Sequence, residues 1–154
     1  MKLLREILYK VEINSVVGNT SLSINKIEFD SRLISDGDMY IAITGVNVDG
    51  HNFISQAIQN GANCIVCEKT PENKSDGVVY VNVKSSRKAL AIISSNYFDN
   101  PSSKLNLIGV TGTNGKTTIA TLLFDLYTEL EIKSGLISTV KISYDNKNFQ
   151  ANQT

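Results

Sequence analysis

The pattern with the clearest chemical meaning is a run of glycine, lysine and hydroxyl residues at 112–118, Gly-Thr-Asn-Gly-Lys-Thr-Thr. An apolar stretch at 105–110 precedes this run and an amphipathic stretch from 116 to about 131 follows it, so it lies where a strand is expected to turn into a helix. The N-terminus of a helix presents unpaired N–H groups and the positive end of the helix dipole. The run therefore predicts a loop that binds nucleotide phosphate groups.

Each residue type in this loop has a physical role. Glycines let the backbone approach the phosphates, Lys116 can reach the β and γ oxygens, and the hydroxyl of Thr117 can bind Mg²⁺. Lys116 is the candidate catalytic residue, because phosphoryl transfer depends on neutralising charge. The candidate nucleotide-binding residues are Gly112, Thr113, Asn114, Gly115, Lys116, Thr117 and Thr118.

The loop departs from the common form G-x-x-x-x-G-K-[ST], which would require glycine at position 110, where the chain has valine. Its glycines are instead spaced by three, at 109, 112 and 115. This spacing disfavours a generic P-loop kinase or GTPase. The alternative to a phosphate-binding loop is a glycine-rich turn that has a lysine beside it by chance and no binding function.

Other side chains allow two interpretations each. His51, the only histidine, is either a base or metal ligand or a residue that orients its loop by hydrogen bonds. Arg32 either pairs with a phosphate or forms a structural salt bridge.

The cysteines of Cys64-Ile-Val-Cys67 fall in a predicted buried strand, where positions i and i+3 face opposite sides. We therefore expect small core residues instead of a redox pair or a metal site. For four aspartates, turn formation and loop capping are the simpler explanation than a carboxylate site; these are Asp30, Asp36, Asp38 and Asp49.

The elements that would position these residues alternate along the chain. Apolar periodicity predicts helices at 3–11, 53–60, 86–98 and 116–131, and strands at 24–29, 39–43, 64–67, 78–83, 105–110 and 135–144. Such alternation predicts an α/β fold with a mostly parallel sheet. We expect a first module at 1–84 and a second, containing the phosphate loop, from 85 to 154.

Composition excludes several classes of protein. The chain has 154 residues, 42% of them hydrophobic, and its 15 basic residues balance 15 acidic ones. Zero net charge provides no general attraction for nucleic acid or an anionic membrane. No secretory signal or membrane span is expected, which predicts a cytoplasmic protein. We expect neither nucleic acid nor a membrane among its partners.

The phosphate loop, with its T-G-T-N-G-K-[ST] form, resembles the ATP loop of the Mur ligase family. Folylpolyglutamate synthases and cyanophycin synthetases have similar loops, but the first module of this chain resembles the UDP-binding domain of MurE-type and MurF-type ligases. MurF-type loops usually have a G-S-x-G-K form, so the resemblance is closest to the MurE type. The segments that carry it in the first module are 30–32, 37–42, Gly45, 49–54 and 61–62.

This resemblance implies an ATP- and Mg²⁺-dependent amide ligase of peptidoglycan precursor synthesis. Such enzymes add a third residue, meso-diaminopimelate or L-lysine, to UDP-N-acetylmuramoyl-L-alanyl-D-glutamate through an acyl phosphate. The implied ATP-binding part is the beginning of a central P-loop-type domain. The substrate-binding positions that the resemblance implies are Phe29, Ser31, Val46, Asn47, Val48, Gln153 and Thr154.

The family also uses residues and a C-terminal domain that this sequence does not contain. We therefore expect the chain to be an N-terminal fragment without ligase activity of its own. A MurF-type or cyanophycin-type ligase and a non-catalytic module that binds a nucleotide or UDP-sugar are the alternatives.

Overall fold

A computed structural model describes residues 1–46, 48–145 and 147–151 of the chain. It divides into two compact units, Met1–Leu105 and the residues from Asn106 onward. Among the described residues, no helix is both long and apolar enough to cross a bilayer.

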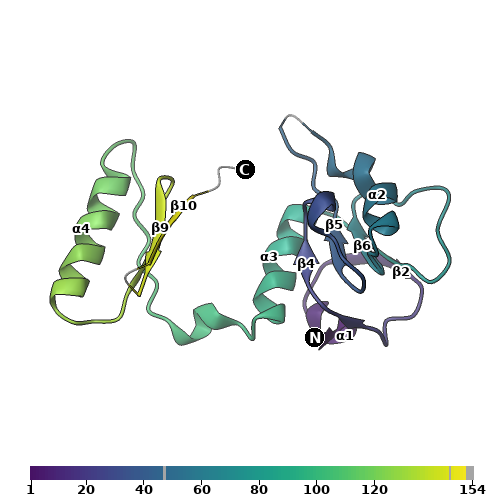
Figure 1. Cartoon of the computed structure of the whole chain (residues 1–154), viewed down its shortest axis with the longest axis horizontal. Coiled ribbons are helices and arrows are strands. Elements are labelled where there is room, and N and C mark those ends of the chain that lie inside the picture. The colour runs from purple at the N-terminus through teal and green to yellow at the C-terminus, as the bar shows by residue number, and fades with distance from the viewer. Residues whose placement is uncertain (47, 146, 152–154) are drawn as a thin grey trace. The chain divides into compact units, whose positions relative to one another are not determined.

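The first unit is built on a five-stranded sheet whose order is β2-β7-β6-β5-β4 (Figure 1). Strands β4 to β7 are parallel to one another, and β2 lies antiparallel to β7 at one edge. The predicted α/β fold with a mostly parallel sheet is therefore confirmed for this central sheet. The bounds are β2 Ile13–Val17, β4 Ile27–Glu28, β5 Met39–Ile41, β6 Cys64–Cys67 and β7 Val79–Val83.

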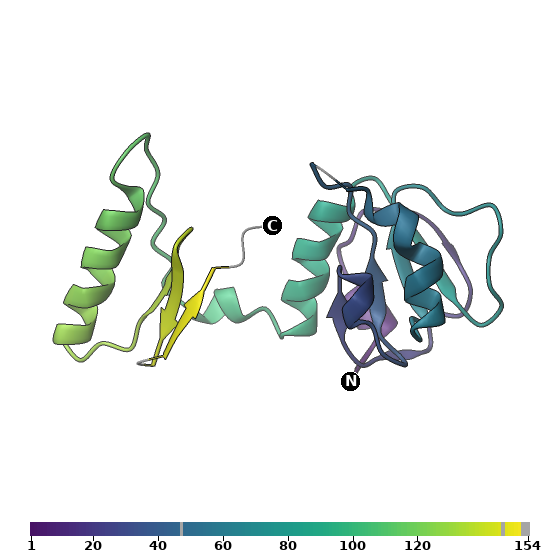
Figure 2. The ribbon, with the colours of Figure 1, turned by 45° about the horizontal axis from the view of Figure 1, so that its top comes forward.

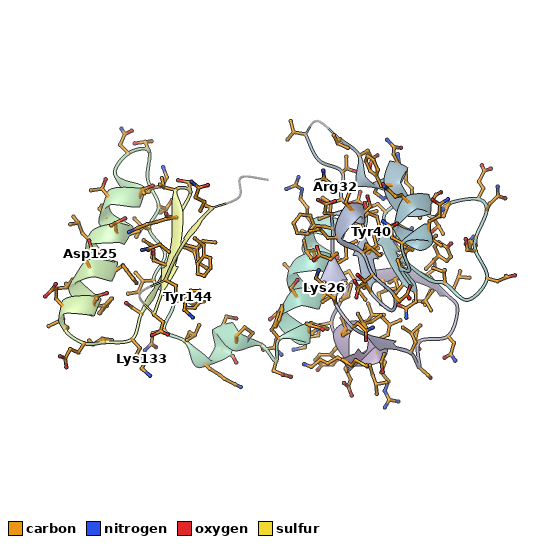
Figure 3. The ribbon with its side chains drawn as sticks, viewed as in Figure 1. Lys26, Arg32, Tyr40, Asp125, Lys133 and Tyr144 are labelled. Atoms are coloured by element: carbon orange, nitrogen blue, oxygen red, sulfur yellow. The ribbon has the colours of Figure 1, made fainter. Side chains whose placement is uncertain are left out.

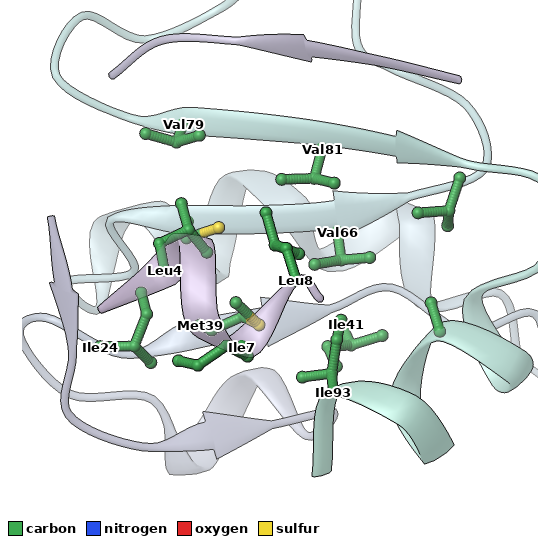
Figure 4. Packing of buried hydrophobic residues seen from close by; sticks show 13 residues of the cluster. Leu4, Ile7, Leu8, Ile24, Met39, Ile41, Val66, Val79, Val81 and Ile93 are labelled. Atoms are coloured by element: carbon green, nitrogen blue, oxygen red, sulfur yellow. The ribbon is translucent and has the colours of Figure 1, made fainter. Parts of the chain in front are cut away.

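One face of this sheet packs against α1 (Leu4–Ile7) and α3 (Ser86–Tyr97). The side chains of Leu4, Ile7 and Ile93 are fully buried there (Figure 4). A short antiparallel pair, β1 (Lys2–Leu3) with β3 (Ser23–Ile24), adjoins this layer.

The opposite face is covered by α2 (Ile54–Gln59), as the turned view in Figure 2 allows the reader to follow. Its apolar cluster includes Tyr40, Ala57 and Ile65. Cys64 belongs to the first cluster and Cys67 to this one, and both thiols are free and buried. Burial raises the pKa of both thiols. Their places in clusters on opposite faces of the sheet match the expectation of small core residues.

Helix α3 belongs to the first unit, which therefore ends at Leu105 instead of at residue 84 as the sequence indicated. Asn96 on α3 donates to the carbonyl oxygens of Ile7 (2.9 Å) and Tyr9 (2.7 Å), and Lys2 donates to the carbonyl oxygen of Asn96 (2.6 Å). Apolar periodicity identifies the buried face of a helix but does not say which neighbouring sheet buries it. The compact unit therefore extends beyond the boundary expected at residue 84.

The second unit contains α4 (Lys116–Glu129) and an antiparallel sheet of order β10-β9-β8. Its strands are β8 Gly135–Ile137, β9 Lys141–Tyr144 and β10 Lys147–Gln150. The single strand expected at 135–144 is a hairpin instead, because the Ser138 hydroxyl accepts from the backbone N–H groups of Val140 (3.3 Å) and Lys141 (3.1 Å) and closes a turn.

Two further expectations were wrong. Residues 106–110 form no strand with any described segment, and the side chains of Leu107 and Ile108 are 72% and 60% exposed; a strand needs a hydrogen-bonded neighbour, which apolar composition alone does not supply. The helix expected at 3–11 stops after Ile7, and Lys10 has a φ of +62°, which is incompatible with a continuing helix.

Candidate functional site

The candidate substrate residues of the first unit follow the carboxyl ends of the parallel strands. Phe29 and Ser31 follow β4, and Val46 and Val48 follow β5. Parallel strands end at a common edge, and ligands of α/β sheets commonly bind outside that edge. We therefore describe this edge of the first unit, with the residues that shape it, as one candidate site.

Ser31 anchors the first loop of this edge to α2. Its side chain is buried, its hydroxyl donates to Oε1 of Gln56 (3.0 Å), and its carbonyl oxygen accepts from Nδ2 of Asn60 (2.8 Å). Phe29, by contrast, is 49% exposed. Ser31 therefore fixes the loop, and Phe29 leaves about half of its side chain exposed on the same loop.

Asp30 and Arg32 form a local ion pair in the same loop (Arg32 is labelled in Figure 3). Asp30 caps the 3-10 helix Ser31–Leu33 by accepting from the backbone N–H of Arg32 (3.0 Å), and it accepts from Nε (2.9 Å) and Nη2 (2.7 Å) of the guanidinium. These hydrogen bonds, the side-chain ones foremost, lower the pKa of Asp30 to about 2. The structure thus shows the salt-bridge role that the sequence left open for Arg32.

The second loop spans residues 44–49, and its described residues, 44–46 and 48–49, close its base and expose two valines. The backbone N–H of Gly45 donates to the carbonyl oxygen of Val48 (2.9 Å), and Thr44 and Asp49 form an isolated antiparallel bridge. Val46 is 97% exposed and Val48 57% exposed. A Cβ atom on Gly45 would lie 2.8 Å from the carbonyl oxygen of Val48, so this turn requires glycine. Asn47, also a candidate, lies outside the described residues.

Tyr40, on β5, holds the backbone directly after this second loop. Its hydroxyl donates to the carbonyl oxygen of Gly50 (2.9 Å), and burial raises its pKa to about 12. The phenol therefore stays protonated and remains a donor. A Cβ atom on Gly50 would lie 2.7 Å from the amide nitrogen of Ile43, so the close approach of the two backbones again excludes a side chain.

His51 lies under the same loop and has partners at both ring nitrogens. Nδ1 lies 2.6 Å from Oδ1 of Asp49, and Nε2 accepts from the backbone N–H of Glu68 (3.0 Å). No group of three or more His, Cys, Asp or Glu residues within the described chain is arranged to hold a metal ion. The contacts match the interpretation of His51 as a residue that orients its loop.

Glu68, just beyond β6, is a site residue that the sequence did not reveal. Its Oε1 accepts from the backbone N–H of Ser86 at the start of α3 (2.8 Å), and its carbonyl oxygen accepts from Nδ2 of Asn82 (2.9 Å). A carboxylate is favourable at the positive end of a helix. The sequence shows only that an acidic residue, Glu68, follows a predicted strand. It does not show that this carboxylate binds the start of α3, which lies 18 residues further along the chain.

Aspartates on both edges of the parallel sheet act as caps and turn formers, Asp30 and Asp49 at the carboxyl edge and Asp38 just before β5. Asp49 caps the 3-10 helix Gly50–Phe53 by accepting from the backbone N–H of His51 (3.0 Å). Asp38 is buried and accepts from the backbone N–H of Ser35 (2.9 Å). Together with the capping by Asp30, these bonds support the turn-forming role that the sequence favoured.

The phosphate loop of the second unit leads directly into α4, as expected. Gly112 and Gly115 have φ values of +147° and +75°, and α4 begins at Lys116. The ammonium of Lys116 donates to the carbonyl oxygens of Gly112 (2.7 Å) and Thr113 (3.3 Å). The loop thus wraps around its lysine, and the conformation at both positive-φ positions favours glycine.

The remaining residues of this loop suit phosphate and Mg²⁺. Residues 112–116 and Thr118 are exposed and Thr117 is half-buried. Within the described part of the chain, the Thr117 hydroxyl has no hydrogen-bond partner, so it is available as an oxygen ligand, the type that Mg²⁺ prefers. Gln153 and Thr154, the last two candidates, lie outside the described residues.

Sequence comparison relates the whole chain to known ligases. A family profile described as "Mur ligase family, catalytic domain" matches residues 23–98, which lie in the first unit. The UDP-N-acetylmuramoyl-L-alanyl-D-glutamate--2,6-diaminopimelate ligase of Cytophaga hutchinsonii is 48% identical over 98% of this chain and 31% of its own length. The ligase of the same name from Clostridium tetani is 43% identical over 98% of this chain and 32% of its own length. The chain thus spans about a third of these relatives.

Solved structures show the same fold. MurF from Acinetobacter baumannii superposes with a TM-score of 0.61 at 23% identity, over 84% of this chain and 28% of that one. MurF from Thermotoga maritima, solved in complex with ADP, gives 0.53 at 33% identity, over 68% of this chain and 23% of that one.

The Asp30–Arg32 pair predicts an unusual titration. The carboxyl group of Asp30 should titrate near pH 2 in an NMR titration, and the ion pair should stabilise the loop above the ordinary aspartate pKa of 3.8 and be lost as the pH falls through about 2. In Arg32→Gln the midpoint should rise, since the positive charge and the two guanidinium hydrogen bonds to Asp30 are lost. Arg87→Gln, which removes another exposed arginine, should leave it unchanged. An unchanged midpoint in Arg32→Gln would contradict the assignment.

Proposed function

Because the chain belongs to the Mur ligase family, we propose that it is part of an ATP-dependent amide ligase of peptidoglycan precursor synthesis. The ligase adds 2,6-diaminopimelate to UDP-N-acetylmuramoyl-L-alanyl-D-glutamate. The observation that carries this proposal is a phosphate loop at the start of α4 in a chain aligned over 98% of its length with a ligase named for that reaction.

The relatives favour this MurE-type reaction over the MurF-type alternative. The ligases from Cytophaga hutchinsonii and Clostridium tetani, at 48% and 43% identity, are both named for 2,6-diaminopimelate. The MurF structures support the fold, and at 23% identity the Acinetobacter baumannii structure bears on the fold alone. L-Lysine as the third residue has no support among these names.

We assign recognition of the UDP-sugar to the edge of the first unit. Phe29 and the tip at Val46 and Val48 offer exposed apolar surface to the nucleoside, and Ser31 holds the first loop in place. Asn47, Gln153 and Thr154 are assigned to the same substrate by family resemblance. The first unit is thus proposed as the UDP-substrate domain, and the second as the start of the ATP-binding domain.

ATP is proposed to bind along residues 112–118. The backbone N–H groups at the start of α4 would bind phosphate oxygens, Lys116 would leave its loop carbonyls for the β and γ oxygens, and Thr117 would hold Mg²⁺. When bound, Mg²⁺ supplies neutralisation of phosphate charge.

The reaction then follows from charge and position. A carboxylate of the substrate attacks the γ-phosphorus of ATP and releases ADP, which forms an acyl phosphate. The amino group of diaminopimelate attacks the acyl carbon, loses a proton and displaces phosphate. Lys116 contributes by stabilising the negative charge that develops on the transferred group.

The UDP-substrate assignment predicts saturable binding. In calorimetric titrations, the chain should bind UDP-N-acetylmuramoyl-L-alanyl-D-glutamate, and it should also bind UDP alone more weakly. Gly45→Ala should weaken this binding by about tenfold, since its Cβ would lie 2.8 Å from the carbonyl oxygen of Val48 and force the loop to move.

Gly109→Ala is the matched control, because its Cβ would have no heavy atom within 4 Å. It should bind like the wild type. Absence of binding by a folded wild-type chain would remove the UDP-substrate assignment, and equal affinities for all three proteins would remove the role of the 44–49 loop.

The ATP assignment predicts that Lys116→Ala in the full-length enzyme lowers kcat by roughly 10²–10³-fold, as expected for the loss of one charge-stabilising donor. The measurement is coupled ADP release with saturating substrates. Lys133→Ala removes an exposed lysine of the same unit (labelled in Figure 3) and should retain wild-type turnover. Unchanged turnover in Lys116→Ala would refute the assignment.

A further inference from the structure

Few contacts among the described residues of the 44–49 loop define its shape. The described bonds within it are the Gly45-to-Val48 backbone hydrogen bond, the bridge between Thr44 and Asp49, and a long hydrogen bond from the Thr44 hydroxyl to Asp49 (3.3 Å). Its tip is almost fully exposed at Val46. A loop of this kind needs an external support to present one conformation to a ligand.

His51 provides such a support by connecting the loop to the end of a neighbouring strand. Its side chain is only 11% exposed. One ring nitrogen contacts Asp49, which closes the loop, and the other contacts the backbone N–H of Glu68, directly after β6. Glu68 is itself hydrogen-bonded to Asn82 on β7 and to the N-terminus of α3, so His51 connects the loop to the sheet and to the helix that covers it.

The partners of His51 determine its tautomer. The backbone N–H of Glu68 can only donate, so Nε2 must carry a lone pair. The single proton of a neutral imidazole must then be on Nδ1, where the Asp49 carboxylate accepts it. Both contacts require the same tautomer, and both ring nitrogens are used, which leaves neither for a metal ion or for proton transfer.

We infer that His51, as the Nδ1–H tautomer, is a positioning residue that holds the 44–49 loop in the shape that binds the nucleotide-sugar. This inference rests on the proposed function of that loop. His51 acts through Asp49 and Glu68 and does not itself contact the substrate.

The tautomer is tested without any ligand. Long-range ¹H–¹⁵N NMR spectra of the chain should show a protonated Nδ1 and an unprotonated Nε2 at neutral pH. The opposite tautomer, or fast exchange between the two, would overturn the inference, because the Glu68 N–H would then lack its acceptor.

Substitutions separate positioning from general stability. His51→Ala should weaken binding of UDP-N-acetylmuramoyl-L-alanyl-D-glutamate by about tenfold or more and accelerate hydrogen exchange of the Gly45 amide. His51→Gln should recover much of both, since its Oε1 can replace Nε2 as acceptor for Glu68. His51→Asn can reach Asp49 only and should recover little.

Asn52→Ala is the control, because the adjacent Asn52 side chain is exposed and makes no hydrogen bond with the described residues; it should match the wild type. If the wild type binds and His51→Ala binds equally well, the inference alone fails. If a folded wild type does not bind, the proposed function of the loop fails and the inference with it. Equal loss in His51→Gln and His51→Asn would assign a merely structural role.

Discussion

The burial of both faces of the β4–β7 sheet is the constraint on which the candidate site depends. Helices α1 and α3 cover one face and α2 covers the other, so the parallel strands are held in register and their carboxyl ends stop at a common edge. Each loop at this edge is then fixed by a bond to the layers beneath it. Ser31 binds α2, Tyr40 holds Gly50, and Glu68 caps α3.

In the second unit, a lysine lies at the N-terminus of a helix, because α4 begins at Lys116. Like-signed charge at the positive end of a helix dipole is unfavourable, and the loop offsets this with two carbonyl oxygens, of Gly112 and Thr113, directed at the ammonium of Lys116. Phosphate oxygens are stronger partners for the same ammonium, because they carry charge. This difference supports the proposal that bound nucleotide phosphate replaces these carbonyls as the partner of Lys116.

The sequence was most informative where one local rule decides the outcome. Strand β6 was predicted at its observed bounds, and the opposite orientations of Cys64 and Cys67 followed from strand periodicity. The start of α4 at Lys116 followed from the glycine and lysine pattern. Contacts between residues distant in sequence could not be predicted. The sheet to which α3 packs, the exposed 106–110 segment and the contact between Glu68 and Ser86 depend on residues distant in sequence, and no local pattern specifies such pairs.

The central claim is that the carboxyl edge of the first unit recognises the UDP-sugar. The most direct measurement is a map of backbone amide shifts in ¹H–¹⁵N NMR spectra of the chain as UDP-N-acetylmuramoyl-L-alanyl-D-glutamate is added. The account predicts saturable changes concentrated at residues 29–32 and 44–51, with little change at the amino ends of the same strands. Changes confined to the phosphate loop, or to the edge strand β2, would contradict it.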